Sequence, residues 1–138
     1  MKKFLFAFLT IVVFASCSKQ SDLPQNIIEK TGSNVFFKDN NLAISSITAT
    51  NTSENKVQVK FSTMYEKNIV KLELMSGDNA NYLCAIHTES LSSNSTQTKN
   101  YTIVDNNPKG AIVYYMIRYS LANGDWGYTN LFKFQRGN

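Results

Sequence analysis

The feature that most constrains the fold is a two-residue alternation of apolar and polar side chains that recurs from Leu42 onward. Val57, Val59 and Phe61 alternate with polar neighbours, and the segment 70–74 repeats the pattern. Such a period places every second side chain on the same face, as in a strand with one buried and one solvated face. No long stretch shows a helical period, so we expect an all-β fold.

Seven segments of this kind are separated by clusters rich in Asn, Asp, Ser and Gly, which are typical of turns. Their spacing over ~95 residues predicts an antiparallel immunoglobulin or fibronectin type III-like sandwich of about seven strands. A closed β-barrel is the structural alternative. The expected strands are 42–50, 57–61, 70–74, 82–88, 101–104, 112–120 and 128–134.

The chain begins with a different pattern. Lys2 and Lys3 precede an apolar run, 4–15, that only Thr10 interrupts. The run is shorter than the about 20 residues that a membrane-spanning helix needs. A basic start followed by a short apolar run is the layout of a secretory signal peptide.

Cys17 follows two small residues, Ala15 and Ser16, at the end of this run. The order resembles a bacterial lipobox, where cleavage leaves an acylated N-terminal cysteine, although Phe14 stands where leucine is usual. We therefore expect lipidation of Cys17 and anchoring in the outer membrane of a bacterial cell envelope. An ordinary signal peptide followed by an accidental cysteine is the alternative. The pattern leaves the periplasmic and the surface leaflet both open.

These patterns divide the chain into three parts. Residues 1–16 form the expected lipoprotein signal peptide, 17–41 an acylated cysteine with a polar tether, and 42–138 the β-sandwich domain. Within the tether, the apolar triplet 35–37 is an exception that could form a short strand or pack on the edge of the domain. The mature part is long enough for one domain.

Charge and cysteine content narrow the partners. Once Lys2 and Lys3 leave with the signal peptide, the 14 Lys and Arg residues become 12, against 10 Asp and Glu residues, a net charge of +2. The cations form no block, so nucleic acid is not an expected partner. With Cys17 acylated, Cys84 would have no disulfide partner, and its strand-like context predicts a buried, inert thiol.

Four blocks of residues follow one another in a fixed order. They are Val57, Val59, Phe61, Thr63, Glu66 and Asn68; Glu73 and Ser76; Tyr101, Asp105 and Pro108; and Tyr114, Tyr115, Ile117, Asn123, Gly124, Tyr128, Thr129 and Asn130. Together they resemble the fibronectin type III-like domains common in Bacteroidetes envelope and secreted proteins. Phe61 replaces the core Trp of that family, Met116 its Arg and Leu121 its Asp. The resemblance implies a sandwich carried on a bacterial lipoprotein, and it implies no ligand.

Several of these residues have structural roles in such a sandwich. Phe61 would be the aromatic plug between the sheets. Tyr115 could form a tyrosine corner, with its hydroxyl bonded to backbone near the turn after Asp105.

No catalytic set is evident, so we expect no enzymatic activity and no cofactor. His87 is the single histidine, and its spacing from Cys84 on a strand points the two side chains to opposite faces. Glycosidase chemistry needs two carboxylates that face each other. The candidate carboxylates fall in separate turns or on wet strand faces, so we expect a solvated position for Glu66, Glu73, Glu89, Asp105 and Asp125.

A calcium site is the one metal alternative. Asp39, Asp78 and Asp125 lie in Asn- and Asp-rich loops whose oxygen atoms could bind Ca²⁺. Turn formation explains the same residues, so we assign no metal ligands.

Trp126 is the residue that points most directly to binding. It lies at the tip of a predicted hairpin, 123–127, where Gly124 and Gly127 can adopt a sharp turn. Trp126 either folds back to cap the core, the interpretation we favour from sequence, or stays exposed as an anchor for a ligand. Tyr114 and Tyr128 are the further candidate binding residues on the wet face.

The sequence therefore predicts a non-enzymatic, lipid-anchored envelope protein that acts as a protein-interaction or accessory module. A partner would bind exposed loops or an uncovered sheet edge. The alternative is a cell-surface glycan-binding or adhesion protein that stacks sugars on Trp126 and nearby tyrosines.

Overall fold

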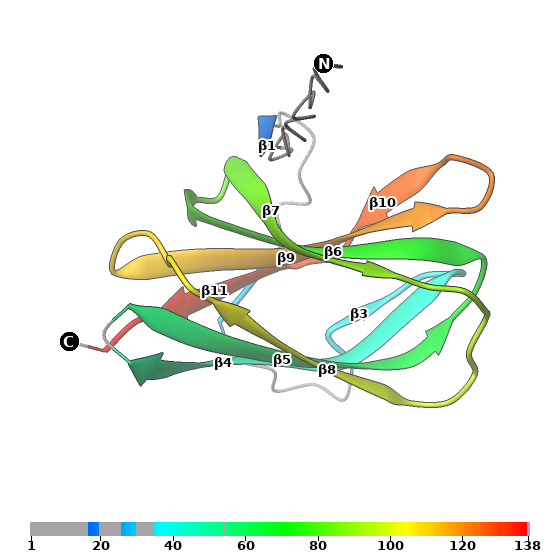
Figure 1. The fold of residues 1–138 in the computed structure, drawn as a ribbon, viewed down its shortest axis with the longest axis horizontal. Helices are drawn as coiled ribbons and strands as arrows, with labels where there is room; N and C mark the ends of the chain where they lie inside the picture. The colour runs from blue at the N-terminus through cyan, green and yellow to red at the C-terminus, as the bar shows by residue number, and fades with distance from the viewer. Residues whose placement is uncertain (1–16, 20–25, 30–34, 54, 138) are drawn as a thin grey trace, which may run out of the picture.

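The computed structural model describes residues 17–19, 26–29, 35–53 and 55–137, so the expected signal peptide lies outside the described residues. The described residues form eleven strands and no helix, and therefore no helix among them is long and apolar enough to cross a membrane. The strands build two sheets stacked as two layers (Figure 1). The predicted all-β sandwich is confirmed.

The first layer, sheet B, has four strands. They lie in the order β3 (Phe37–Lys38), β4 (Leu42–Ser53), β5 (Lys56–Glu66) and β8 (Lys99–Asp105), all antiparallel. Val57, Val59 and Phe61 are buried and point inward, as their alternation predicts.

The second layer, sheet A, has seven strands in the described part of the chain. Of their pairs, the β2–β11 pair is parallel and the others are antiparallel. The order is β1 (Cys17–Lys19), β7 (Tyr82–Ser90), β6 (Ile69–Asn79), β9 (Ile112–Leu121), β11 (Leu131–Gln135) and β2 (Ile27–Ile28), with β10 (Trp126–Tyr128) also pairing β9.

All seven expected strands are present, and the last of them is divided into β10 and β11. The division falls at Thr129, whose Oγ1 accepts a hydrogen bond from the Ile117 N–H at 3.0 Å. The side chain thus takes the place of a backbone acceptor. Packing β4-β5-β8 against β7-β6-β9-β11 gives the immunoglobulin/fibronectin type III-like arrangement.

The core lies between the two sheets. Phe61 is 3 % exposed and belongs to the core, as expected of the aromatic plug, and its ring stacks on Tyr101 of the neighbouring strand β8 with centroids 4.7 Å apart. Phe36, which precedes β3, is only 2 % exposed and meets the Phe132 ring edge-on at 6.5 Å. The apolar triplet 35–37 therefore contributes both a short strand and a core side chain.

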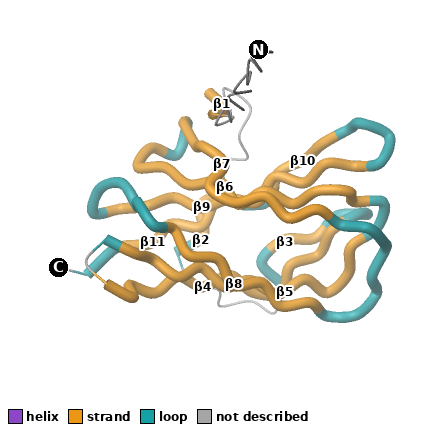
Figure 2. The backbone as a smooth tube through the Cα atoms, in the orientation of Figure 1, coloured by secondary structure: helices purple, strands orange, loops and turns teal. Residues whose placement is uncertain are grey.

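The loops gather at the two ends of the sandwich (Figure 2). The β9–β10 turn lies at one end, and the C-terminus lies at the opposite end with the β8–β9 loop (Figure 1). Binding residues carried on loops can therefore form two separate groups, one at each end.

Candidate functional site

Trp126 is exposed to solvent. Its side chain is 59 % accessible, and its ring meets the Tyr128 ring nearly perpendicularly at a centroid distance of 5.2 Å. The expectation that Trp126 caps the core is wrong. The register explains the outcome, because Trp126 pairs with Ser120 on the outer face of sheet A, whereas Tyr119 points inward and fills the end of the core.

The turn that carries Trp126 is braced by hydrogen bonds. The Leu121 N–H donates to the Asp125 carbonyl at 2.7 Å, and the Gly124 N–H donates to the Leu121 carbonyl at 3.0 Å. The Asn123 amide donates to the Asp125 carboxylate at 2.7 Å. Gly124 has φ of +93°, a conformation that glycine adopts readily. The exposed ring is therefore held on a preorganised turn.

A buried ion pair lies beside this aromatic pair on the same outer face. The Arg118 Nε donates to the Glu73 carboxylate at 2.7 Å, and the Lys71 ammonium lies 3.3 Å from the other Glu73 oxygen. Arg118 stands directly opposite Tyr128 in the β9–β10 register. We call Trp126, Tyr128, Arg118, Glu73 and Lys71 the Trp126 surface.

The expectation that Glu73 is solvated is wrong, because its residue is only 5 % exposed. Burial by itself raises the pKa of Glu73, but the hydrogen bond and charge of Arg118 and the charge of Lys71 outweigh burial and hold that pKa below its usual value. The same contact raises the pKa of Arg118. The pair therefore stays charged at neutral pH.

Tyr114, the third candidate, lies on the same face but farther along β9, opposite Gly77. Tyr114 and Tyr128 are both half-buried, and they pack against a second apolar cluster separate from the main core. The buried members of this cluster are Met75, Leu83, Met116 and Leu131. The structure thus places the three predicted binding residues on one face and brings only Trp126 and Tyr128 into ring contact among them.

Two more carboxylates that we expect to be solvated are buried. Glu66 accepts hydrogen bonds from the Thr63 hydroxyl at 2.8 Å, the Lys99 ammonium at 2.6 Å and the Tyr101 hydroxyl at 2.6 Å. Each donor comes from a strand of sheet B, so Glu66 fastens β5 to β8. Glu66 as a whole is 1 % exposed to solvent. The expectation of a wet position is therefore wrong for Glu66.

Asp105 is the other buried carboxylate and links the two sheets. It accepts hydrogen bonds from the Ser76 hydroxyl at 2.8 Å and the Tyr115 hydroxyl at 3.0 Å. It also accepts one from the Asn107 N–H at 3.1 Å. Tyr115 therefore bonds a carboxylate and not the backbone acceptor that we predict. Burial, together with the charge of Asp105, raises the pKa of Tyr115.

Of the three aspartates considered for calcium, Asp39 and Asp125 act in turns, whereas Asp78 is an exposed residue near the end of β6. Asp39 Oδ1 accepts hydrogen bonds from the Asn41 and Leu42 N–H groups, both at 2.7 Å, and Asp39 Oδ2 accepts the Tyr119 hydroxyl. Asp125 bonds within its own turn, as above. Among the described residues, no three His, Cys, Asp or Glu side chains cluster as metal ligands would.

The two cysteines are bonded to each other in the structure. β1 pairs antiparallel with β7, so Cys17 stands opposite Cys84 and their sulfur atoms form a disulfide. The prediction that Cys84 is a free thiol is wrong. A sulfur atom in a disulfide cannot carry a diacylglyceryl thioether, so the disulfide and the predicted lipidation are alternative states of Cys17. His87 is partly exposed and lies 3.4 Å from the Glu89 carboxylate, as a solvated histidine would.

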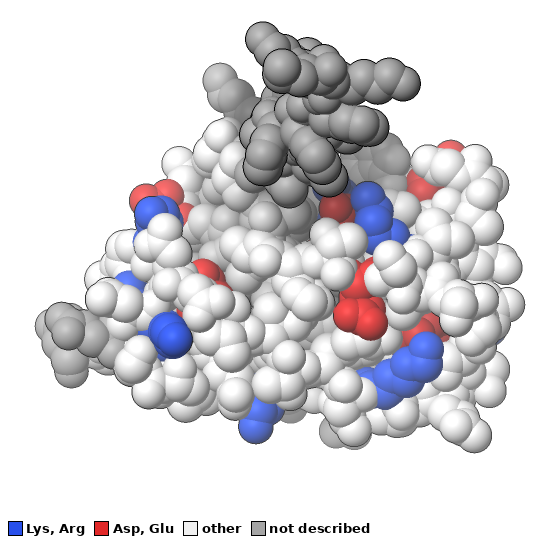
Figure 3. Space-filling view, in the orientation of Figure 1, with Lys and Arg blue, Asp and Glu red and all other residues white. Residues whose placement is uncertain are grey.

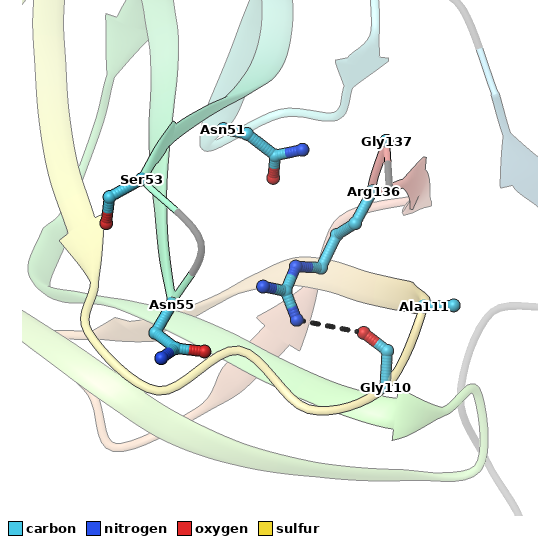
Figure 4. Close-up of a pocket in the computed structure, with 7 residues that line it drawn as sticks. All are labelled: Asn51, Ser53, Asn55, Gly110, Ala111, Arg136 and Gly137. Carbon is cyan, nitrogen blue, oxygen red and sulfur yellow. Dashed lines mark hydrogen bonds between the residues drawn. The ribbon is translucent and has the colours of Figure 1, made fainter.

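The opposite end of the sandwich carries an open polar hollow of about 700 Å³ (Figure 4). Asn51, Ser53 and Asn55 line one side, and the Arg136 guanidinium lies on the other side. Arg136 donates to the carbonyl oxygens of Pro108 at 3.3 Å and Gly110 at 3.1 Å. Arg136 thus fastens the C-terminal segment to the β8–β9 loop, which is a structural role.

Acidic and basic side chains are scattered singly and in pairs over the face shown in Figure 3. Comparison of the chain with models of protein families, with curated proteins and with solved structures gives no match. What the Trp126 surface can bind is therefore inferred from its geometry alone. An exposed indole, a neighbouring phenol and a buried ion pair can bind by stacking, apolar contact and hydrogen bonding.

Proposed function

We propose that this protein is a non-enzymatic, lipid-anchored module of a bacterial cell envelope that docks a protein partner on the Trp126 surface. The observation that carries the proposal is the exposed Trp126 ring on a turn that internal hydrogen bonds already hold in place. A large aromatic side chain has no role in forming that turn, and exposing it to water is unfavourable. A bound partner would offset this cost.

The composition of the Trp126 surface favours a protein partner. Trp, Tyr and Arg are the residues that contribute most often to the energetic centre of protein interfaces. Here all three lie together, and the Arg118 guanidinium is already held in place by Glu73. Little side-chain entropy would be lost on binding, because the ring and the guanidinium are both restrained before the partner arrives.

Substitution of Trp126 tests this proposal. Chemical crosslinking in intact envelopes should trap one dominant protein partner, and W126A should reduce its yield by about tenfold or more. M64A is the matched control, because Met64 is also exposed, at 42 %, but lies in sheet B. Equal yields from W126A and M64A, with both variants folded, would refute docking on the Trp126 surface.

The sequence around Cys17 supports the anchor. A basic pair, a short apolar run and two small residues precede this cysteine, which matches the order in acylated envelope proteins. Intact-mass measurement of the membrane-bound protein tests the anchor directly. A diacylglyceryl thioether on Cys17 is expected, and a chain that retains the disulfide and carries no lipid would contradict it.

Protease treatment of intact cells, beside a lysed control, determines whether the protein is anchored in the periplasmic or the surface leaflet of the outer membrane. Digestion of the β-sandwich domain in intact cells would place it outside the cell. Protection until lysis would place it in the periplasm.

Glycan binding is the second candidate function, and one observation favours it. A hollow of about 410 Å³ near the Trp126 turn is lined by the polar residues Asn41, Asn68, Asn123 and Asp125 together with the apolar residues Leu121 and Ala122. Amide and carboxylate groups bind sugar hydroxyls, and an adjacent ring can stack on a sugar face. Trp126 is the single tryptophan, so its fluorescence during titration with sugars reports this site alone. An unchanged signal with every sugar tested would exclude stacking on Trp126.

A further inference from the structure

We propose that, once Cys17 is lipidated, the edge of β7 that β1 occupies in the structure pairs with β7 of a second copy of this chain, the two strands running antiparallel with Cys84 opposite Cys84 of the second copy. The inference concerns a surface separate from the Trp126 surface. It rests on the proposed function in one respect, which is that lipidation of Cys17 removes the sulfur that Cys84 bonds in the structure.

β7 lies near the margin of sheet A, and among the described strands only β1 pairs with its outer edge. That pairing covers Tyr82–Cys84 and leaves the rest of β7 without a described strand on that side. The edge therefore accepts an antiparallel strand with a cysteine directly opposite Cys84. A second β7 strand can meet the same requirement, because it also carries Cys84.

The sequence around Cys84 is suited to symmetric pairing. In an antiparallel pair centred on Cys84, Leu83 faces Ala85 of the second copy and Tyr82 faces Ile86, and each contact occurs twice. Tyr82 is 46 % exposed and Ile86 is 38 % exposed, although both are large apolar residues. Pairing would cover both side chains on each copy and would bring no like charges together.

The length of the paired segment is limited by a bulge. The β6–β7 register passes from His87 to Ala85 between adjacent β6 residues, so Ile86 has no opposite residue in β6. Bulges bend a strand away from regular pairing. The segment available for pairing is therefore 82–86, and β1 and a second copy compete for it.

The test uses the full chain with C17S, which frees Cys84 without requiring lipid. Oxidised glutathione supplies the oxidant. One Cys84 thiolate attacks it, forms a mixed disulfide and releases one glutathione thiolate. The Cys84 thiolate of the second copy then attacks that mixed disulfide and releases the other thiolate. We expect a disulfide-linked dimer on non-reducing gels, and C17S/C84S should give none.

A second substitution separates strand pairing from random thiol contact. C17S/I86K places a lysine in the proposed interface and should lower the dimer yield about tenfold. C17S/V104K is the matched control, because Val104 is 41 % exposed on β8, which is an edge strand of sheet B. It should dimerise like C17S.

Circular dichroism is the check that each variant is folded. A folded C17S chain that stays monomeric with a titratable Cys84 thiol would overturn the proposal. Equal dimer yields from the I86K and V104K variants would overturn it too. Neither result bears on partner binding at the Trp126 surface, which W126A tests separately.

Discussion

At the residue scale, the sequence pattern locates the core residue Phe61 well but misplaces Trp126 and the buried carboxylates. Phe61 was predictable because it belongs to an alternating run. Glu66, Glu73 and Asp105 look like surface residues, since a charged side chain is rarely buried without a partner. Their partners come from other strands, so nothing next to them in sequence signals burial.

The Asp105 carboxylate should be important for stability, because it accepts three hydrogen bonds in a buried position. D105A leaves the Ser76 and Tyr115 hydroxyls without their acceptor. We expect a loss of about 3 kcal/mol in the free energy of unfolding, measured by urea denaturation.

Asp125 provides the matched control, because it is an exposed aspartate that also bonds within a turn. D125A should cost about 1 kcal/mol or less. Similar losses in D105A and D125A would show that burial of the Asp105 network does not contribute to stability.

At the scale of strands and turns, the seven main strands follow from period-two alternation, and the short additions do not. β1 and β2 pair with strands far away along the chain, so no local sequence pattern predicts them. The disulfide could not be predicted for the same reason, since its cysteines are 67 residues apart. The exposure of Trp126 depends on strand register, and a one-residue shift would reverse the faces.

Gly127 should tolerate substitution less well than its place in a hairpin suggests. It stands opposite Tyr119, and a Cβ atom on residue 127 would overlap the Tyr119 ring. G127A should therefore lower the free energy of unfolding by about 1–3 kcal/mol. Thermal denaturation of G127A beside G137A measures this, since a Cβ on Gly137 would meet only one atom, at 3.9 Å. An equal melting temperature for the two variants would argue against close packing at Gly127.

The disulfide gives a prediction for the oxidised, unlipidated chain. Closing a loop of this length restricts the unfolded state and stabilises the fold by about 4 kcal/mol in the chain-entropy model. C84S should lose this stabilisation, and reduction of the parent chain should reproduce the loss. A reducing agent should leave the stability of C84S unchanged. If the reducing agent lowers the stability of C84S as much as the stability of the parent chain, the stabilisation does not come from the disulfide.

At the scale of the whole molecule, the class and the layering follow from the sequence, and the binding face does not. Alternation shows that each sheet has an inner and an outer face. It does not show which outer face carries the exposed ring, because that choice depends on how β10 pairs with β9. The sandwich as a whole is held by apolar packing and by carboxylates that tie strands together within and between the sheets.

Alkaline pH should destabilise the whole sandwich. Burial and a neighbouring carboxylate raise the pKa values of Tyr101, Tyr115 and Tyr119 above the ordinary value of 10.0. The unfolded chain ionises these phenols first, so their contribution to stability is complete below about pH 10 and is lost as pH rises further. The phenolate absorbance of these three tyrosines should appear together with loss of β-sheet circular dichroism. Ionisation of all seven tyrosines before unfolding would contradict this.

The measurement that tests the central claim most directly is site-specific photo-crosslinking in intact cells. A photoreactive residue at position 120, opposite Trp126 on the outer face of sheet A, keeps the indole in place. The same residue at position 60, exposed on sheet B, is the control. We predict one dominant protein adduct from position 120, none from position 60, and a loss of about tenfold in adduct when W126A is added. Adducts that are equal at both positions, or unaffected by W126A, would contradict docking on the Trp126 surface.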